Sequence, residues 1–240
     1  MHRFFIDKTP VVGETVSITG AQQHHISRVL RLGKDDIITL CDGQPFEYKA
    51  RIKRADKLSV TLEIIDCYPC NTEPKHRVTL FQSLPKAGKM DSIIQKCVEL
   101  GVSSIVPIKT ERCVPRPASE YEQKHIRLLR IAHEAAKQSR RCIVPEILPL
   151  RNLGECVFSD YELTLLAYEE EKEKTLKSVL CNSSAMEIAI IIGPEGGFTS
   201  EEAAHICALG AKSVTLGPRI LRTETAGAAM LAMLLYELEV

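Results

Sequence analysis

The chain lacks several features that would narrow its function directly. It has 240 residues without a tryptophan, only 5% of them are aromatic, and its formal net charge is zero. No apolar run approaches the roughly 20 residues that a membrane-spanning helix needs. Residues 1–5 are followed by Asp7 and Lys8, not by the apolar region of a signal peptide. We therefore expect a cytoplasmic protein without a membrane segment and with few aromatic platforms on which bases could stack.

Common nucleotide and metal motifs are also missing. The glycine-rich stretch 193–197 is not followed by the Gly-Lys-Ser/Thr of a P-loop, and it does not have the G-x-G-x-x-G spacing of a dinucleotide site. Cys67 and Cys70 form the one C-x-x-C, and no second pair or H-x-x-x-H completes a zinc site. The nine cysteines are an odd number, which argues against a full disulfide framework. We expect reduced thiols and no metal.

The zero net charge hides a strong asymmetry along the chain. Residues 75–141 carry fourteen basic and six acidic side chains, a net charge of +8, whereas residues 142–240 carry seven and fifteen, a net charge of −8. A basic middle segment indicates a site for a polyanion. The alternative is that the two parts attract each other, within one chain or across a dimer. Charge alone does not separate these two interpretations.

The first 70 residues have the pattern of a small β-domain. Residues 37–41, 46–52 and 59–64 are strand candidates with a period of two, and Asp42-Gly43 between the first two suits a tight hairpin. Residues 22–32 favour a short helix. Several short strands with turn signals predict a small barrel. The polar stretch 69–74 has a proline at each end and is the predicted linker.

From residue 77 onward, strand and helix patterns alternate, which predicts a largely parallel sheet covered by helices. The expected strands are residues 78–84, 104–108, 163–168, 187–192 and 213–216, and the expected helices are residues 90–100, 121–140, 199–210 and 225–238. Thr199 and Glu202 have the spacing of a capping box at the start of the third helix.

Two loops in this region join a strand to a helix and contain glycine. They are Gly193-Pro-Glu-Gly-Gly197 and Leu216-Gly-Pro-Arg-Ile-Leu-Arg-Thr-Glu-Thr-Ala226. The carboxyl edge of a parallel sheet is where ligands bind, and glycine lets a ligand approach the backbone closely. The loops therefore predict a ligand-binding edge. The plainer alternatives are ordinary turns, or close packing of the small residues 226–229 against another backbone.

Five stretches that follow one another along the chain carry a family resemblance. They are His24-His25-Ile-Ser-Arg-Val-Leu-Arg31, residues 89–101, residues 133–139, Ile192-Gly-Pro-Glu-Gly-Gly-Phe198 and Leu216 to Ala226. The sequence resembles the RsmE family of the SPOUT class, whose members methylate a ring nitrogen of a uridine in small-subunit ribosomal RNA. The resemblance implies a PUA-like β-barrel that binds RNA in residues 1–72. It also implies an α/β methyltransferase domain with a C-terminal trefoil knot in residues 73–240.

In this class, S-adenosylmethionine lies bent against three loops, and the enzymes are typically homodimers. The cofactor-binding residues implied here are Leu166, Ala167, Tyr168, Gly193, Pro194, Glu195, Gly196, Gly197, Leu216, Gly217, Ile220, Leu221, Arg222 and Thr223. The implied substrate is small-subunit (16S) ribosomal RNA, free or in an assembled subunit, methylated at uridine N3. A catalytically silent RNA-binding protein of the same fold is the alternative. A dinucleotide oxidoreductase is disfavoured by the missing G-x-G-x-x-G.

The chemistry suggests two catalytic candidates in the second loop. A uracil ring N–H is a poor nucleophile until it loses its proton, so the reaction needs a base or a cation that stabilises the ring anion. We assign Arg222 to the developing charge or an RNA phosphate, and Glu224 to proton removal or base orientation. The alternative for Glu224 is an acidic residue that favours a helix N-terminus.

Contacts to the RNA backbone are expected from lysine and arginine side chains, which give affinity rather than sequence readout. The candidates are Arg3, Arg28, Arg31, Lys86, Lys89, Arg112, Arg116 and Arg140.

Overall fold

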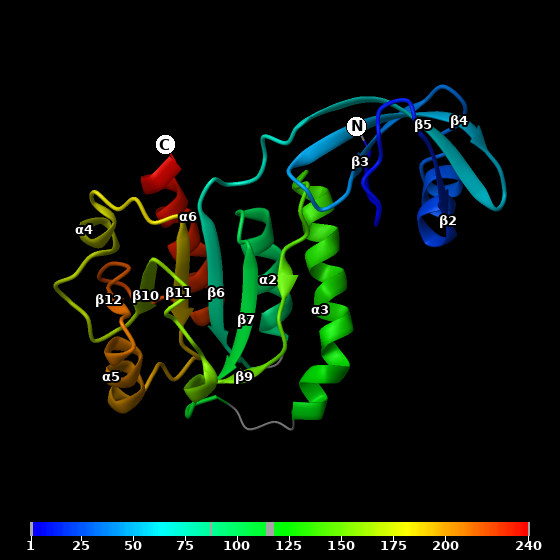
Figure 1. The fold of residues 1–240 in the computed structure, drawn as a ribbon. Helices are drawn as coiled ribbons and strands as arrows, with labels where there is room; N and C mark the ends of the chain where they lie inside the picture. Colours follow the sequence, from blue (N-terminus) through cyan, green and yellow to red (C-terminus); the bar gives the residue numbers. More distant parts are fainter. Residues whose placement is uncertain (1, 87, 114–117, 240) are drawn as a thin grey trace. The chain divides into compact units, whose positions relative to one another are not determined.

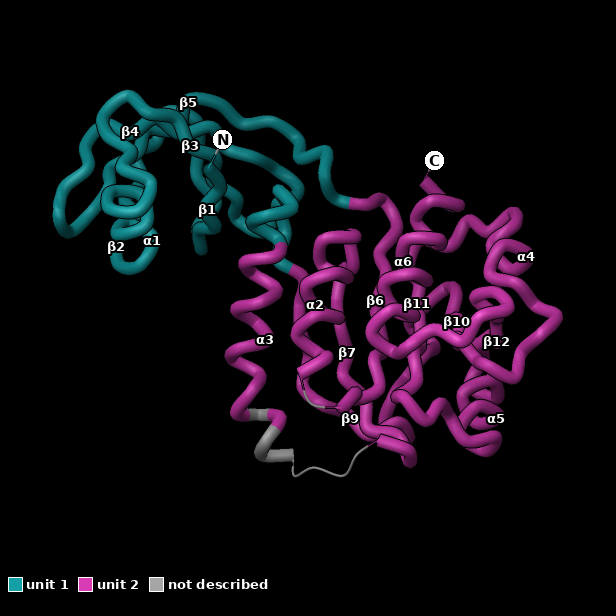
Figure 2. Tube along the Cα trace, turned by 180° about the vertical axis from the view of Figure 1, so that it is seen from behind, with its two compact units in different colours: residues 1–73, 136–144 teal, residues 74–135, 145–240 magenta. Residues whose placement is uncertain are grey.

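A computed structural model describes residues 2–86, 88–113 and 118–239. The chain forms two compact units, shown in teal and magenta in Figure 2. Unit 1 comprises Met1–Glu73 together with Ala136–Val144, and unit 2 comprises Pro74–Ala135 and Pro145–Val240. The second segment of unit 1 therefore comes from residues that follow the first segment only after the 62 residues 74–135.

Unit 1 is built on a five-stranded sheet in the order β1-β3-β4-β5-β2. The strands are β1 (Arg3–Phe5), β2 (Thr15–Thr19), β3 (Ile37–Cys41), β4 (Phe46–Ala55) and β5 (Ser59–Pro69). The predicted hairpin is confirmed: β3 and β4 pair antiparallel, and Gly43 between them has a φ of 79°. β1 and β2 form the two edges, so the sheet does not close into a full barrel. Its core contains Ile38 and Leu62.

The short helix predicted for residues 22–32 is also present in unit 1. It starts earlier, as α1 (Gly20–His24), and continues as one π-helical turn, η1 (His25–Val29). Ile26 faces the sheet and is completely buried. Strands β1 and β2 were not predicted, because β1 has three residues and β2 buries only Ile18.

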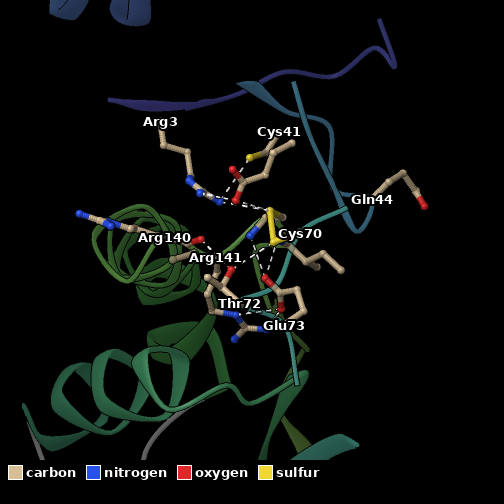
Figure 3. Close-up of a disulfide and its surroundings, with 12 residues drawn as sticks. Arg3, Cys41, Gln44, Cys70, Thr72, Glu73, Arg140 and Arg141 are labelled. Carbon is tan, nitrogen blue, oxygen red and sulfur yellow. Dashed lines mark hydrogen bonds and ion pairs between the residues drawn. A yellow bond between two sulfur atoms is a disulfide. The ribbon is translucent and has the colours of Figure 1, made fainter. Parts of the chain in front are cut away.

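The expectation that all the thiols are reduced was wrong for one pair. A disulfide joins Cys70, just after β5, to Cys142 (Figure 3). The two cysteines are 72 positions apart in the sequence, so no local pattern indicated the pairing. Around them, Arg141 Nη2 lies 2.6 Å from Glu73 Oε2, and Thr72 Oγ1 donates to the Arg140 carbonyl oxygen at 2.8 Å. The bond and these contacts attach residues 136–144 to the β-domain.

Unit 2 contains the predicted parallel sheet, in the order β12-β10-β11-β6-β7-β8, with β9 also paired to β7 (Figure 1). Every pair of strands in it is parallel. The strands are β6 (Arg77–Ser83), β7 (Ser104–Lys109), β8 (Glu146–Ile147), β9 (Arg151–Asn152), β10 (Leu163–Ala167), β11 (Glu187–Ile192) and β12 (Lys212–Val214). β11 has the predicted bounds, and its residues 188–192 are buried as a strand covered on both faces requires.

The four predicted helices of unit 2 begin and end near their expected bounds, as α2 (Lys89–Glu99), α3 (Ala118–Gln138), α5 (Ser200–Ala208) and α6 (Thr223–Glu239). The short helix α4 (Leu176–Leu180) and the 3-10 turn η2 (Leu153–Glu155) were not predicted. The capping box of α5 is confirmed: Glu202 N donates to Thr199 Oγ1 at 3.1 Å, and Thr199 N donates to Glu202 Oε2 at 3.0 Å. α6 starts two residues earlier than expected, since the N–H groups of Thr225 and Ala226 both donate to the Arg222 carbonyl oxygen.

The packing of α6 positions the loops of interest. This helix lies against β6, β11 and α2, and its buried residues include Met230, Leu231 and Leu234. The first turn of α6 therefore lies beside the carboxyl end of β11. Among the described residues, no helix is long and apolar enough to cross a membrane.

Candidate functional site

A cavity of about 720 Å³ lies at the carboxyl ends of β10, β11 and β12. β12, β10 and β11 are neighbours in the sheet, so the loops that follow them meet at one edge. The walls come from residues 167–169, 171–172, 192–195, 197–198 and 215–223, with Thr175 and Ala226. This is the position at which open α/β sheets bind ligands, and its volume is in the range of small-molecule sites.

The predicted cofactor residues line this cavity, except for Leu166 and Gly196. Leu166 is completely buried inside β10. Gly196 lies outside the lining, and its carbonyl oxygen accepts a hydrogen bond from Arg112 Nη1 at 2.8 Å. Glu169, Phe198, Pro218 and Arg219 also line the cavity, and they lie in the three loops that the family resemblance implies, residues 166–169, 193–198 and 216–223. Sequence reasoning missed six lining residues outside these loops: Glu171, Lys172, Thr175, Ile192, Thr215 and Ala226. The acidic run that follows β10 was the available signal for Glu171.

One wall of the cavity carries a strongly ionised carboxylate. Glu171 accepts a hydrogen bond from Ser213 Oγ at 2.6 Å, and others from the backbone N–H groups of Lys174 and Glu173. These bonds lower the pKa of Glu171 to about 2, because they stabilise the charged form. Glu169 adds a second carboxylate to the same wall, and Lys172 adds one cation. These three lining residues carry a net charge of −1, which suits a ligand with positive charge.

A buried chain of hydrogen bonds joins the two glycine loops. Thr223, the first residue of α6, donates from Oγ1 to the Gly193 carbonyl oxygen at 2.7 Å. Gln82 at the end of β6 is completely buried and donates from Nε2 to Thr223 Oγ1 at 2.9 Å. Thr223 and Gly193 both line the cavity, so this chain fixes the loops from their inner side.

A cluster of charged groups connects the same two loops nearer the surface. Lys89 Nζ is 2.9 Å from Glu195 Oε1 and 3.0 Å from Glu224 Oε2. These contacts raise the pKa of Lys89. The pKa of Glu224 is lowered by its own backbone N–H and by Lys89. Burial raises the pKa of Glu195, but its hydrogen bonds, led by the one from Lys89, bring the net shift below the usual value.

The two catalytic candidates occupy different positions. Arg222 lines the cavity and is exposed, whereas Glu224 lies behind the lining in the first turn of α6. Glu224 is the acidic residue at a helix N-terminus that the sequence left as an alternative, and it also has a cationic partner in Lys89. No local sequence pattern indicated that Glu224 pairs with Lys89.

The residues predicted to bind RNA fall into three groups. Arg28, Arg31, Lys86 and Arg140 have exposed side chains. Lys89 and Arg112 are engaged with the glycine loops, through Glu195 and Glu224 or through the Gly196 carbonyl. Arg116 lies outside the described residues.

Arg3 is the third group, and the structure corrects its assignment. The Arg3 side chain is 8% exposed, and Nη2 lies 2.6 Å from Glu47 Oε1 (Figure 3). Nη1 also donates to Cys142 Sγ at 3.1 Å. A guanidinium held by a buried carboxylate is not available to a phosphate. Arg3 instead joins β1 to the disulfide region of unit 1.

The same region contains the one group of three potential metal ligands found among the described residues. It consists of Glu47, Cys70 and Cys142. The two sulfur atoms are joined in the disulfide, and the Arg3 cation adjoins them. A disulfide offers no thiolate, so this donor set does not suit a metal ion.

Comparisons with known proteins agree on one family. The family model described as an RNA methyltransferase domain matches residues 71–235, and the model described as an RNA methyltransferase PUA domain matches residues 18–65. Ribosomal RNA small subunit methyltransferase E of Bacillus subtilis is 33% identical, with 100% of this chain and 98% of that protein covered. The enzyme of the same name from Aquifex aeolicus is 32% identical, with 98% and 99% covered.

Solved structures show the same relationship. The structure of ribosomal RNA small subunit methyltransferase E from Neisseria gonorrhoeae bound to S-adenosyl methionine has a TM-score of 0.87 and 33% identity, covering 97% of this chain and 96% of that one. A Legionella pneumophila protein with bound S-adenosyl methionine has a TM-score of 0.84 and 31% identity, with the same coverage. The chain therefore belongs to the RNA methyltransferase family of ribosomal RNA small subunit methyltransferase E, with a PUA-like N-terminal sheet and a SPOUT-type α/β unit.

Proposed function

We propose that this protein transfers the methyl group of S-adenosylmethionine to N3 of a specific uridine in small-subunit (16S) ribosomal RNA. Membership of the family supports ribosomal RNA methylation, and the relatives with bound S-adenosylmethionine support the cofactor. The choice of uridine N3 rests on the resemblance of the five sequence stretches. The observation that carries the proposal is the cavity built from the two glycine loops of the matching stretches.

S-adenosylmethionine fits the chemistry of this cavity. The cofactor carries a sulfonium and an ammonium group, and the wall formed by Glu169 and Glu171 has the opposite charge. The glycine loops leave backbone groups open to hydrogen-bond a nucleoside. We assign cofactor binding to those predicted residues that line the cavity. Leu166 and Gly196 do not line it, and we assign them a role in supporting the loops. When bound, the cofactor supplies the methyl group, and the protein's task is to align it with the acceptor nitrogen.

Arg222 is proposed to act on the acceptor. It is exposed at the cavity wall, where a cation would stabilise the uracil anion that forms as the ring loses its proton. Glu224 is proposed to orient the base or to accept that proton. Its pKa is lowered and it contacts Lys89, which makes it a weak proton acceptor and favours the orienting role. The proton then passes to solvent or to an RNA group.

We further propose a division of labour between residues 1–72 and residues 73–240. The first part is the RNA-binding PUA-like domain, whose exposed Arg28 and Arg31 contact phosphates. The second is the methyltransferase domain, with Lys86 as a further RNA contact and with the expected C-terminal trefoil knot. Arg140 is also proposed to contact RNA, from the segment 136–144 that packs on the β-domain. A homodimer is proposed from the family resemblance, and the apolar ring of Tyr236 on α6, which is 69% exposed, is available for such an interface. Action on ribosomal RNA would place the protein in the cytoplasm.

The proposal is tested by incubating the protein with labelled S-adenosylmethionine and small ribosomal subunits that lack the modification. Label in the RNA, mapped to N3 of one uridine by mass spectrometry, is the expected result. Label at another position would overturn the choice of atom alone. RNA binding without any label would favour the catalytically silent RNA-binding protein instead. Free ribosomal RNA in a parallel reaction distinguishes the two substrate forms.

A further inference from the structure

Lys89 occupies an unusual position for a residue expected at an RNA surface. It is the first residue of α2, directly after Gly88, whose φ of 85° turns the chain into the helix. Its ammonium lies within 3.0 Å of two carboxylates, one from each glycine loop. The side chains of Lys89, Glu195 and Glu224 are 28%, 23% and 19% exposed. Their charges are thus only partly screened by water.

The two loops need a connection because the sheet does not supply one. β10 lies between β11 and β12 in the strand order, so no backbone pairing joins the strands from which the loops emerge. The Thr223–Gly193 hydrogen bond joins them on the buried side. Lys89 makes the second connection, through Glu195 of the first loop and Glu224 of the second.

The connection depends on charge balance. Both carboxylates contact the same ammonium, so without it two negative charges would face each other a few ångströms apart. Like charges at that separation repel, and the repulsion would separate the loops or raise the pKa of one carboxylate. The backbone N–H of Lys86 also donates to Glu195, at 3.1 Å and 3.3 Å. That contact holds Glu195 but does not neutralise it.

We propose that Lys89 is a positioning residue, which keeps the two glycine loops at the separation that S-adenosylmethionine needs by neutralising Glu195 and Glu224. Lys89 and Glu224 do not line the cavity, whereas Glu195 does. Lys89 therefore acts on the cofactor site through its partners. This role replaces the phosphate contact expected for Lys89 from the sequence. The inference rests on the proposed function, because it takes S-adenosylmethionine as the ligand of the cavity.

The test measures S-adenosylmethionine affinity by calorimetry for the full chain and a set of variants. We expect Lys89→Met to weaken binding about fivefold to tenfold, as for the loss of a partly buried ion pair. Lys89→Arg should restore most of the affinity. Removing one of the two negative charges should also restore it, so Lys89→Met/Glu224→Gln should bind more tightly than Lys89→Met. Lys96→Met is the matched control, because Lys96 is an exposed lysine on the same helix.

The pH dependence separates charge balance from a general structural effect. In Lys89→Met, affinity should recover between about pH 8 and about pH 5, as protonation of a carboxylate removes the repulsion. The wild-type protein should show no such recovery, because the pKa values of both carboxylates are lowered. RNA affinity should be the same in Lys89→Met and wild type.

The outcomes are distinguishable. If wild type binds S-adenosylmethionine and Lys89→Met binds it equally well at every pH, the positioning role is wrong. If the double variant binds as weakly as Lys89→Met, the explanation that Lys89 acts by neutralising the two carboxylates is wrong. If Lys89→Met loses RNA affinity alone, Lys89 is a phosphate contact. If wild type itself does not bind S-adenosylmethionine, the proposed function fails instead.

Discussion

The carboxylate of Glu169 lies where a side chain at position 197 would have to be placed. A Cβ built on Gly197 would stand 2.6 Å from Glu169 Oε1. Gly197 also has a φ of 67°, in the left-handed region that favours glycine. The carboxylate of Glu169, in the loop after β10, can therefore lie against the loop after β11 because residue 197 has no side chain.

This relationship predicts the effect of Gly197→Ala. The added methyl group must displace Glu169, and the backbone conformation costs about 1 kcal/mol more for alanine. We expect a lower free energy of unfolding and S-adenosylmethionine binding weakened about tenfold. Gly154→Ala is the control, because a Cβ there meets no atom within 4 Å. Wild-type affinity in Gly197→Ala would contradict the packing explanation, and Glu169→Ala should partly rescue the variant.

Glu171 predicts a pH dependence of stability. Its pKa in the folded protein is about 2, below the ordinary value of 4.5. A lowered folded pKa contributes stability that is fully present above the unfolded pKa and is lost as the pH falls through the folded one. Glu171→Gln should therefore melt at a lower temperature than wild type at neutral pH. The difference should shrink as the pH falls from 4.5 toward 2. Glu170→Gln, which changes an adjacent exposed carboxylate, should show no such convergence.

Glu224→Gln tests the second catalytic candidate. It keeps the shape of the side chain but cannot accept a proton or hold a negative charge. We expect methylation to slow by about tenfold to hundredfold, with S-adenosylmethionine affinity close to that of wild type. Single-turnover methylation and calorimetry measure the two quantities separately. A wild-type rate would exclude a catalytic role and leave Glu224 with its two structural roles, at the helix N-terminus and as a partner of Lys89.

The Cys70–Cys142 disulfide leads to two predictions, one for the number of reactive thiols and one for the free energy of unfolding. Unfolded without reductant, the protein should expose the seven free cysteines, and reduction should add two. Because the bond closes a long loop, its loss should lower the free energy of unfolding by about 2–4 kcal/mol. Urea unfolding of Cys142→Ser measures this, with the exposed Cys181→Ser as the control. Nine reactive thiols before reduction would show that the bond does not form.

The RNA contacts of unit 1 are tested by Arg28→Ala/Arg31→Ala. Both side chains are exposed. Loss of two phosphate contacts should weaken binding of small-subunit RNA. It should also reduce the slope of log affinity against log salt concentration by about two. Binding titrations at several salt concentrations measure both effects. An unchanged salt slope would exclude these arginines from the RNA interface. Lys57→Ala, also exposed in unit 1, serves as the control.

Much of the fold was predictable because its signals are local. The apolar run of β11 and the capping box at Thr199 and Glu202 are properties of a few adjacent residues, and both are present. The strands that were missed are short or lie at an edge, such as β2, which buries one residue. Such strands form because a partner strand is available, and this depends on tertiary structure rather than on local pattern.

The sequence by itself determined where the ligand-binding edge lies. Strands that alternate with helices must run parallel, and parallel strands bring their following loops to one edge of the sheet. Only the tertiary structure decided which charged groups meet. Arg3 pairs with Glu47, Lys89 with Glu195 and Glu224, and Arg112 with the Gly196 carbonyl. Charge tells which groups attract, but burial and chain geometry decide which of many possible partners comes within 3 Å.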